Sequence, residues 1–336
     1  AEMNIRSVAI YTETDRYGLY VKGANEAYPL GEDPLAGYLD PLRIVNLAVE
    51  TGCDAIHPGY GFLSENPQLA RYCEQKGIIF IGPKADVIGK MGDKTQARTA
   101  MKEAGVPVTP GSDGNLEDLD QAISEAQRIG YPVMLKATSG GGGRGIRRCD
   151  SDDDLRKQYP RVISEATKAF GSAEVFMEKC IVDPRHIEVQ VLADSHGNAI
   201  HLYERDCSIQ RRNQKLIEIA PSPQIDAAQR QRLGELAVTA ALAVGYENAG
   251  TVEFLMSGDN VYFMEMNTRI QVEHTITEQI TGVDIVREQI RIAEGQALRY
   301  AQSEIGFRGY AIQMRINAED PKNDFLPSFG RITHYY

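Results

Sequence analysis

The first third of the chain alternates short strand-like runs with amphipathic stretches. Three short runs are predicted strands: Ser7–Tyr11, Asp54–His57 and Ile78–Ile81. Two stretches carry apolar residues at helical spacing and are each followed by a glycine: Leu42–Thr51 and Asn66–Lys76. Strands and helices that alternate in this way predict a parallel sheet with crossover helices. We expect residues 1–5 to be the last turn of a helix.

The remainder of the chain mixes longer helices with alternating strands. Helical periodicity is found at Asp93–Ala104, Leu116–Ile129, Asp150–Ala169, Ala227–Val244 and Val283–Gly295. Strands are predicted at Tyr131–Ala137, Val175–Glu178, His186–Ala193 and Ala199–Glu204, with a hairpin at Gly250–Met256 and Asn260–Met266. Arg308–Asn317 begins another strand-rich segment. This part is therefore expected to be mixed and largely antiparallel.

The composition is that of a globular and acidic protein. The 336 residues suggest roughly two domains or three small ones. Lys and Arg number 36 against 47 Asp and Glu, a net charge of −11, so the overall field disfavours nucleic acid or an anionic membrane as a partner. An anion can be held only in a local basic pocket. No apolar stretch approaches the ~18 residues of a membrane span, and no signal peptide is visible.

The cysteines, the histidines and the ends of the chain indicate what kind of protein this is. The five cysteines are scattered and lack a CxxC pair, which indicates reduced thiols in a cytoplasmic protein. The six histidines show no HxxxH or HExxH spacing, which disfavours zinc. The chain has no initiator Met and stops inside the strand-like run Arg331–Tyr336, so we expect a piece of a longer polypeptide.

A glycine run, residues 140–143, follows the predicted strand that contains Lys136. Glycines let backbone N–H groups approach phosphate oxygens closely, although such a run can also be a flexible hairpin tip. A P-loop motif is absent, and the spacing is poor for a dinucleotide fingerprint. Lys136 and Lys94 could meet phosphates as point charges. A solvated surface position is the alternative for either lysine.

Two carboxylates lie on the arms of the predicted hairpin. Glu253 and Glu265 are expected side by side on one face, and Asn267 adds an amide oxygen two residues further on. Buried carboxylates repel each other unless a cation lies between them, and Mg²⁺ prefers oxygen ligands. The alternative is a pair of exposed strand carboxylates. The apolar neighbours in the hairpin favour the metal site.

Two polar clusters complete the candidate chemistry. In Met266–His274, Arg269 could hold an anion and Glu273 could act as a general base. Glu204–Lys215 contains four cations and is either a basic surface loop or an oxyanion pocket. Its Cys207 has no local base and is expected to be a packing residue. Together with the lysines, the glycine run and the acidic hairpin, these clusters predict phosphoryl transfer from a nucleotide.

At this point the chain resembles biotin carboxylase, an ATP-grasp enzyme, over nearly its whole length. The motifs that carry the resemblance are HPGYGFLSENP (57–67), MGDK (91–94), LKATSGGGGRGI (135–146), ERDCSIQRRNQK (204–215), GTVEFL (250–255), EMNTRIQVEHTITEQITGVDIV (265–286) and RINAEDP (315–321). Many long motifs in the right order make the resemblance specific.

The resemblance implies a role for individual residues. Nucleotide binding is implied for Gly141, Gly142, Gly143, Lys94, Lys136, Glu178, Lys179, Ile181, His186, Gln210, Asn213 and Leu255. The implied ligands of Mg²⁺ (or Mn²⁺) are Glu253 and Glu265, with Asn267 nearby. Bicarbonate would be seated by Arg269, Gln271 and Val272 and deprotonated by Glu273. Lys215 would steady carboxyphosphate, and Arg315 would stabilise the biotin enolate.

The resemblance also implies the fold, the reaction and the partners. The fold would be ATP-grasp, of the α/β class and in part α+β. Residues 1–83 would form an N-terminal parallel-sheet domain without its first strand, 84–298 the ATP-grasp domain with a mobile lid at about 108–180, and 306–336 the start of a truncated C-terminal domain. ATP and bicarbonate would carboxylate biotin on a carrier. The partners would be a biotin carboxyl carrier domain, a second copy of the chain in a homodimer, and a carboxyltransferase subunit.

The carboxyl acceptor stays open at this point. Asn213 stands where many members have His, and residues 213–221 are most similar to the biotin carboxylase subunits of two-subunit pyruvate or 2-oxoglutarate carboxylases. We therefore favour a pyruvate carboxylase component, with acetyl-CoA or propionyl-CoA carboxylase next. Another ATP-grasp ligase, such as a carbamoyl phosphate synthetase half, and a non-catalytic ATP-binding module are the alternatives.

Overall fold

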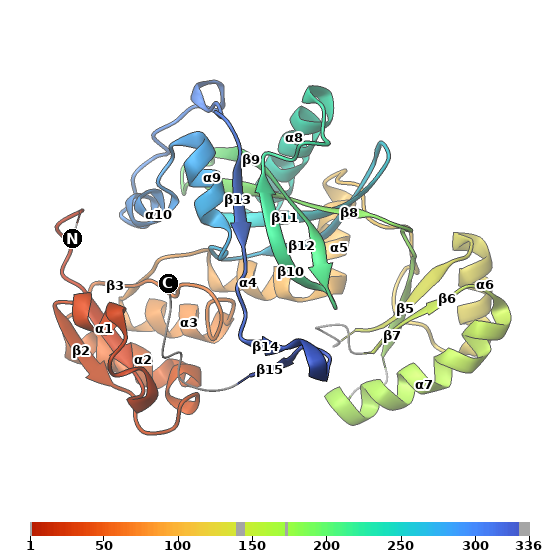
Figure 1. Ribbon diagram of the computed structural model, residues 1–336, viewed down its shortest axis with the longest axis horizontal. Coiled ribbons are helices and arrows are strands. Elements are labelled where there is room, and N and C mark those ends of the chain that lie inside the picture. The colour runs from red at the N-terminus through yellow and green to blue at the C-terminus, as the bar shows by residue number, and fades with distance from the viewer. Residues whose placement is uncertain (1, 139–144, 172–173, 329–336) are drawn as a thin grey trace.

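The computed structural model describes residues 2–138, 145–171 and 174–328. Figure 1 shows an N-terminal part at the lower left, a central sheet with its helices, and a small lobe at the right. Gly141, Gly142 and Gly143 lie outside the described residues, as does the run Arg331–Tyr336. Within the described residues, none of the helices combines the length and the apolar character needed to cross a membrane.

The N-terminal part is built on two parallel strand pairs. β1 (Val8–Tyr11) pairs with β2 (Glu26–Pro29), and β3 (Ala55–Ile56) pairs with β4 (Ile79–Phe80). Three helices connect the strands: α1 (Leu19–Gly23), α2 (Pro41–Glu50) and α3 (Pro67–Lys76). Val45 and Cys73 are fully buried in the core between these helices and strands. The parallel pairing predicted from the alternation of strands and helices is confirmed.

Some local predictions in this part were wrong or incomplete. Residues 2–3 form a turn instead of the expected end of a helix, and Asn4 has a left-handed φ of 54°, which a helix cannot continue through. α1 and β2 were missed because five and four residues are too few to show a period.

Two helices link the N-terminal part to the rest of the molecule. α4 (Ala85–Gly92) was missed, since Gly89 and Gly92 weaken its helical pattern. α5 (Lys94–Glu103) begins at Asp93, whose carboxylate accepts hydrogen bonds from the backbone N–H groups of Thr95 and Gln96. This cap makes Lys94 the first residue of α5.

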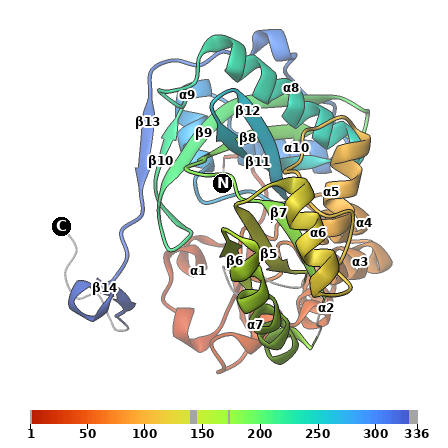
Figure 2. The same ribbon diagram turned by 90° about the vertical axis from the view of Figure 1, so that its right-hand side faces the viewer.

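The small lobe is a three-stranded antiparallel sheet covered by two helices. Its strand order is β6 (Ile146–Cys149), β5 (Val133–Ala137), β7 (Val175–Lys179). α6 (Leu119–Ile129) and α7 (Asp152–Phe170) pack on it, and apolar residues of all these elements form one core. Figure 2, turned by 90°, shows the two helices on the side of the lobe that faces the viewer. The opposite face of this sheet is left to border the site described below.

The central sheet has six antiparallel strands. Its order is β12 (Asn260–Asn267), β11 (Asn248–Ser257), β8 (Arg185–Ala193), β9 (Ala199–Arg211), β10 (Gln214–Ala220), β13 (Ala311–Met314). α8 (Ala227–Ala243) packs on β8 and β9, α9 (His274–Thr281) on β9, β10 and β13, and α10 (Ile285–Ala293) on β11. Separate apolar clusters against α8 and against α10 bury both faces of the sheet. The mixed and largely antiparallel arrangement expected for this part is confirmed.

The last described segment returns along the edge of the central sheet. After β13, a small hairpin of β14 (Glu319–Asp320) and β15 (Leu326–Pro327) lies against the turn between β9 and β10. The guanidinium of Arg211 stacks on the ring of Phe325, 4.0 Å from its centroid, and pairs with Glu319. These contacts fix the β9–β10 turn.

Candidate active site

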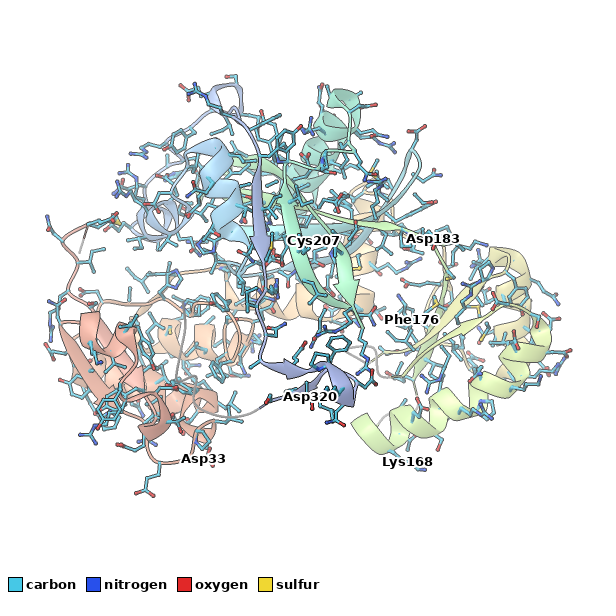
Figure 3. The ribbon with its side chains drawn as sticks, viewed as in Figure 1. Asp33, Lys168, Phe176, Asp183, Cys207 and Asp320 are labelled. Carbon is cyan, nitrogen blue, oxygen red and sulfur yellow. The ribbon has the colours of Figure 1, made fainter. Side chains whose placement is uncertain are left out.

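A cavity of about 1360 Å³ lies where the parts of the molecule meet. The small lobe, the central sheet, the N-terminal part and the segment after β13 all contribute to its wall. Figure 3 labels Phe176 in the small lobe, Cys207 in the central sheet and Asp320 in the β14–β15 hairpin, next to cavity residues in each part. The cavity has room for a nucleotide together with a second substrate.

The structure places every described residue of the predicted site around this one cavity. Its wall includes Lys94, Lys136, Glu178, Lys179, Ile181, His186, Gln210, Asn213, Lys215, Glu253, Leu255, Glu265, Asn267, Arg269, Gln271, Val272, Glu273 and Arg315. They come from α5, from strands of both antiparallel sheets and from the segments between the elements, and residues 94 and 315 are far apart in the sequence. Their meeting in one cavity is a property of the tertiary fold.

Lys215 lies at the centre of a cluster of acids. Its Nζ donates to Glu253 Oε1 at 2.9 Å and to Glu273 Oε1 at 2.9 Å, and it also pairs with Glu188. Burial alone would lower the pKa of Lys215, but the charges of Glu188 and Glu253 outweigh it and raise that pKa. Lys215 is therefore a permanent cation between three carboxylates.

Glu253 faces Glu265 across the β11–β12 hairpin, as the sequence predicted. The two residues are register partners, and both carboxylates border the cavity. Burial would raise the pKa of Glu253, but the adjacent His186, with Nε2 at 2.7 Å, and Lys215 lower it. Burial of its carboxylate and the charge of Glu253 raise the pKa of Glu265. The pair thus contains one carboxylate whose pKa is lowered and one whose pKa is raised.

The donor set around this pair fits a divalent metal. Two opposed carboxylates and the nearby amide of Asn267 are oxygen ligands of the kind that Mg²⁺ takes. Glu253 Oε1 already accepts from Asn267 Nδ2 at 2.8 Å and Gln271 Nε2 at 2.9 Å. A metal at this pair would therefore replace some of the donors to Glu253, and it would add positive charge beside Glu265, whose pKa is raised by burial and by the charge of Glu253.

Glu273 connects Lys215 to Arg315. Its Oε2 accepts from Arg315 Nη2 at 3.0 Å, while Arg315 Nε donates to Glu218 Oε1 at 2.7 Å. Acids and bases alternate from Glu253 through Lys215, Glu273 and Arg315 to Glu218. This row places a carboxylate that can accept a proton between two fixed cations.

A second set of cations lies between the small lobe and α5. Glu178 of β7 pairs with Lys136 of β5 and accepts from Arg98 Nη1 of α5 at 3.1 Å. Lys179 Nζ donates to the carbonyls of Gly130 and Tyr131, each at 2.8 Å. Lys136, Arg98 and Lys179 all border the cavity, but the ammonium of Lys179 is tied to the backbone of its own lobe.

The basic segment Glu204–Lys215 is neither a surface loop nor an oxyanion pocket as a whole. It forms β9, β10 and the turn between them, where Arg212 and Asn213 take left-handed φ angles of 52° and 63°. Its four cations differ in place: Lys215 borders the cavity, Arg205 is buried behind it, and Arg211 and Arg212 pair with Glu319 and Asp324. Burial raises the pKa of the Cys207 thiol, which agrees with the expected packing role.

Several supporting residues were not predicted from the sequence. Glu188 and Gln190 lie in β8 and are fully buried beside Arg205. Arg98, Glu218 and Glu65 contact predicted site residues from other elements. A signal existed for β8, where His186, Glu188 and Gln190 occupy every second position and the residues from Ile187 onward are otherwise apolar. Polar residues on one face of a buried strand indicate an internal site.

Comparison with known proteins decides the family. Residues 1–88 match the model of the biotin carboxylase N-terminal domain, and residues 93–301 match that of the ATP-binding domain of the carbamoyl-phosphate synthase L chain. The chain is 54% identical over 336 residues to a biotin carboxylase of Halalkalibacterium halodurans, covering 99% of this chain and 74% of that protein. The chain belongs to the biotin carboxylase family. It is an ATP-dependent ligase with the ATP-grasp fold.

Other relatives within the biotin carboxylase family carry more specific names. The 2-oxoglutarate carboxylase small subunit of Hydrogenobacter thermophilus is 57% identical over 100% of this chain and 71% of its own length. One of the pyruvate carboxylase subunits of Methanothermobacter thermautotrophicus is 54% identical over 99% of this chain and 68% of its own length. The chain thus spans about seven tenths of the length of these relatives.

Solved structures of biotin carboxylases share this fold. The biotin carboxylase domain dimer of the Hydrogenobacter thermophilus 2-oxoglutarate carboxylase, in complex with MgADP, ADP and bicarbonate, superposes with a TM-score of 0.93 at 57% identity, over 100% of this chain and 74% of that one. The Campylobacter jejuni biotin carboxylase in complex with β,γ-ATP has a TM-score of 0.94 at 49% identity, over 100% of this chain and 75% of that one. The cofactors predicted from the sequence, ATP with Mg²⁺, bicarbonate and biotin on a carrier, are those of this family.

Proposed function

We propose that this biotin carboxylase works as a component of a pyruvate carboxylase, and that the cavity residues act in the roles argued below. The observation that carries the proposal is the row Glu253–Lys215–Glu273–Arg315 in one cavity. Bicarbonate is a poor nucleophile, so its attack on a phosphate needs a base and fixed positive charge at the same place. The row provides both.

Glu273 is the proposed base. Its two oxygens are held by Lys215 and Arg315, which fix the carboxylate in the cavity wall. A bicarbonate beside Glu273 would lose its proton to this carboxylate as its oxygen attacks the terminal phosphate of ATP, which breaks the bond to ADP and gives carboxyphosphate. Carboxyphosphate would then break down to phosphate and CO2, and CO2 would carboxylate N1 of biotin. Lys215 is close enough to compensate the charge of the resulting carboxyphosphate. Arg315, on the far side of Glu273, is the residue proposed to stabilise the enolate form of biotin.

The loop Asn267–Glu273 is the proposed seat of bicarbonate. It runs from the end of β12 to α9, so the positive end of the α9 dipole is directed at the loop. Arg269, Gln271 and Val272 all border the cavity. In the proposal, the guanidinium of Arg269 and the backbone N–H groups of Gln271 and Val272 donate to the oxygens of bicarbonate.

The other end of the cavity is the proposed nucleotide site. Ile181 and Leu255 offer apolar surface for a base, with Glu178, Lys179, His186, Gln210 and Asn213 around it, and Lys94 and Lys136 are the phosphate partners. Glu253, Glu265 and Asn267 would hold Mg²⁺, which supplies charge neutralisation at the transferring phosphate. Gly141, Gly142 and Gly143 keep their expected role in the proposal. The domain limits 1–83, 84–298 and 306–336, with a lid at about 108–180, are proposed on the same basis.

Pyruvate as the acceptor is proposed on the names of two relatives. Both are subunits of enzymes that carboxylate a 2-oxo acid, one named for pyruvate and one for 2-oxoglutarate. A separate biotin carrier and carboxyltransferase subunit would then be the partners, with a homodimer of the biotin carboxylase. The five unpaired cysteines support a cytoplasmic location. An acetyl-CoA or propionyl-CoA carboxylase is the alternative.

The reaction is tested by incorporation of labelled bicarbonate into free biotin and by bicarbonate-dependent release of ADP. Glu273→Gln keeps the shape of the side chain but cannot accept the proton, so we expect carboxylation to fall by roughly 10²–10⁴-fold while ATP still binds. Glu235→Gln, on the exposed face of α8, is the matched control. Full activity in Glu273→Gln would remove Glu273 as the base. Carboxylated biotin carrier, offered to carboxyltransferases for pyruvate, 2-oxoglutarate or acetyl-CoA, identifies the acceptor.

A further inference from the structure

A carboxylate of the N-terminal part reaches the proposed bicarbonate seat from outside the cavity. Glu65 lies in the segment before α3, 204 residues from Arg269 in the sequence. Its Oε2 accepts a hydrogen bond from Arg269 Nε at 2.9 Å, and its Oε1 accepts one from the backbone N–H of Thr268 at 3.2 Å. Glu65 does not itself border the cavity. Glu65 therefore contacts Arg269, the residue proposed to bind bicarbonate, but lies outside the cavity in which bicarbonate would bind.

The contacts of Arg269 determine which of its donors face the cavity. Nε donates to Glu65, Nη1 to the carbonyl of Ile270 at 3.2 Å, and Nη2 to Asn267 Oδ1 at 2.9 Å. A guanidinium has five N–H groups, so the described residues leave one donor on each terminal nitrogen. Because the group is planar, a partner at Nε and one at Nη2 fix its plane. Glu65 thereby orients the two remaining donors.

The backbone around Glu65 is itself fixed. Asn66 caps α3 by accepting hydrogen bonds from the backbone N–H groups of Gln68 and Leu69. Leu63 and Ser64 are buried, and the backbone N–H of Asn66 donates to the carbonyl of Leu63. The carboxylate is thus presented from a rigid turn rather than from a free surface loop.

We propose that Glu65 is a positioning residue that orients Arg269 for bicarbonate and so makes the N-terminal part a contributor to the bicarbonate site. The inference rests on the proposed role of Arg269. The side chain of Glu65 is 42% exposed and that of Arg269 is 21% exposed. A pair this accessible contributes little to stability, so its effect is on the geometry of Arg269. Variants at Glu65 should consequently fold.

The test is steady-state kinetics of bicarbonate-dependent ATP cleavage by the full chain. Glu65→Ala should raise the KM for bicarbonate about tenfold, because a charge-assisted hydrogen bond that fixes the plane of Arg269 is lost. Glu65→Gln keeps one acceptor oxygen and should restore part of the affinity. The KM for ATP and the melting temperature should stay at the values of the unchanged protein. Glu74→Gln, on the exposed face of α3, is the control.

Arg269→Ala separates failure of the inference from failure of the proposed function. If Arg269→Ala raises the KM for bicarbonate and Glu65→Ala does not, Glu65 has no positioning role and the bicarbonate seat stands. If neither variant changes it, the seat itself is refuted and the inference with it. If Glu65→Ala raises both KM values together and lowers the melting temperature, its role is structural and the inference is overturned. The double variant should be no worse than Arg269→Ala, since Glu65 acts through Arg269.

Discussion

Arg205 is the fully buried guanidinium behind the active-site cavity, and its replacement by Met should destabilise the protein by about 3–5 kcal/mol. All five of its N–H groups are used as donors, to Glu188, Gln190, Thr251, Gln271 and Thr277. Met has similar length and no charge, so it removes the donors without opening a large void. The change therefore isolates the electrostatic contribution of the guanidinium.

The magnitude follows from what the five acceptors can do afterwards. The two threonine hydroxyls can rotate toward other partners, so their loss costs little. Glu188 is 0% exposed; in Arg205→Met its carboxylate keeps the ion pair with Lys215 but loses the ion pair with Arg205. A buried charge deprived of a partner dominates the total, at about 3–5 kcal/mol. Arg205→Lys retains the charge with three donors in place of five and should cost about 2 kcal/mol, the penalty for buried acceptors left unpaired.

Urea denaturation followed by far-UV circular dichroism measures both variants, since the chain has no Trp for a fluorescence probe. Arg212→Met in the same hairpin is the control, because its pair with Asp324 has side chains 60% and 78% exposed. This control should change the free energy of unfolding by no more than about 0.5 kcal/mol. If Arg205→Met shifts the unfolding midpoint no further than Arg212→Met does, the argument from the buried guanidinium is refuted.

Two further predictions concern pH and packing. Burial lowers the pKa of His57, whose Nε2 lies 3.1 Å from Gln289 Oε1, so the unfolded chain binds a proton on this residue at a higher pH than the folded protein does. The free energy of unfolding should therefore fall as the pH drops below about 6.5. His57→Gln should weaken this fall in a plot of melting temperature against pH. If the slope of that plot is unchanged in His57→Gln, another group causes the pH dependence. Gly234→Ala should destabilise by about 1–3 kcal/mol, because a Cβ there would lie 2.3 Å from His201 Nε2. Gly89→Ala, with nothing within 4 Å of its Cβ, should instead stabilise the helix by about 0.5–1 kcal/mol. Thermal melting measures both glycine variants. Melting temperatures that change in the same direction in the two variants would contradict the packing argument.

Local patterns predicted the parts of the site that are local in the sequence. Glu253 and Glu265 belong to one hairpin with a short turn, so the spacing brings them near each other. Counting from the turn pair Ser257–Asn260 would set Glu253 opposite Met264, and the β-bulge between Glu253 and Phe254 is what makes Glu265 its partner. Helices α2, α3, α5 and α8 were found within one to two residues of their ends, because each has a clear cap or a glycine after it. Where the sequence offered a period and a stop signal, the structure agrees.

The supporting contacts could not be predicted in this way. Glu65 and Arg269 are joined across 204 residues, and Arg205 meets Glu188 only through the register of β8 with β9. No periodicity encodes such a register, because it depends on how separate elements pack. The cations of Glu204–Lys215 could not be separated by their spacing in the sequence either. In the β9–β10 hairpin, Arg205 is buried, Lys215 borders the cavity, and Arg211 and Arg212 pair with residues of the last described segment.

The pairing of the site cations has a consequence for how the cavity receives its substrates. Lys136 is held by Glu178, Arg269 by Glu65, Lys215 by three carboxylates, and Arg315 by Glu218 and Glu273. A phosphate or bicarbonate that binds these cations therefore replaces a carboxylate of the chain as well as water. The exchange costs part of the attraction, but it keeps the cations oriented and paired between turnovers. It also favours anions that engage several of these cations at once, as a nucleotide polyphosphate beside bicarbonate would, over single small anions that meet one cation alone.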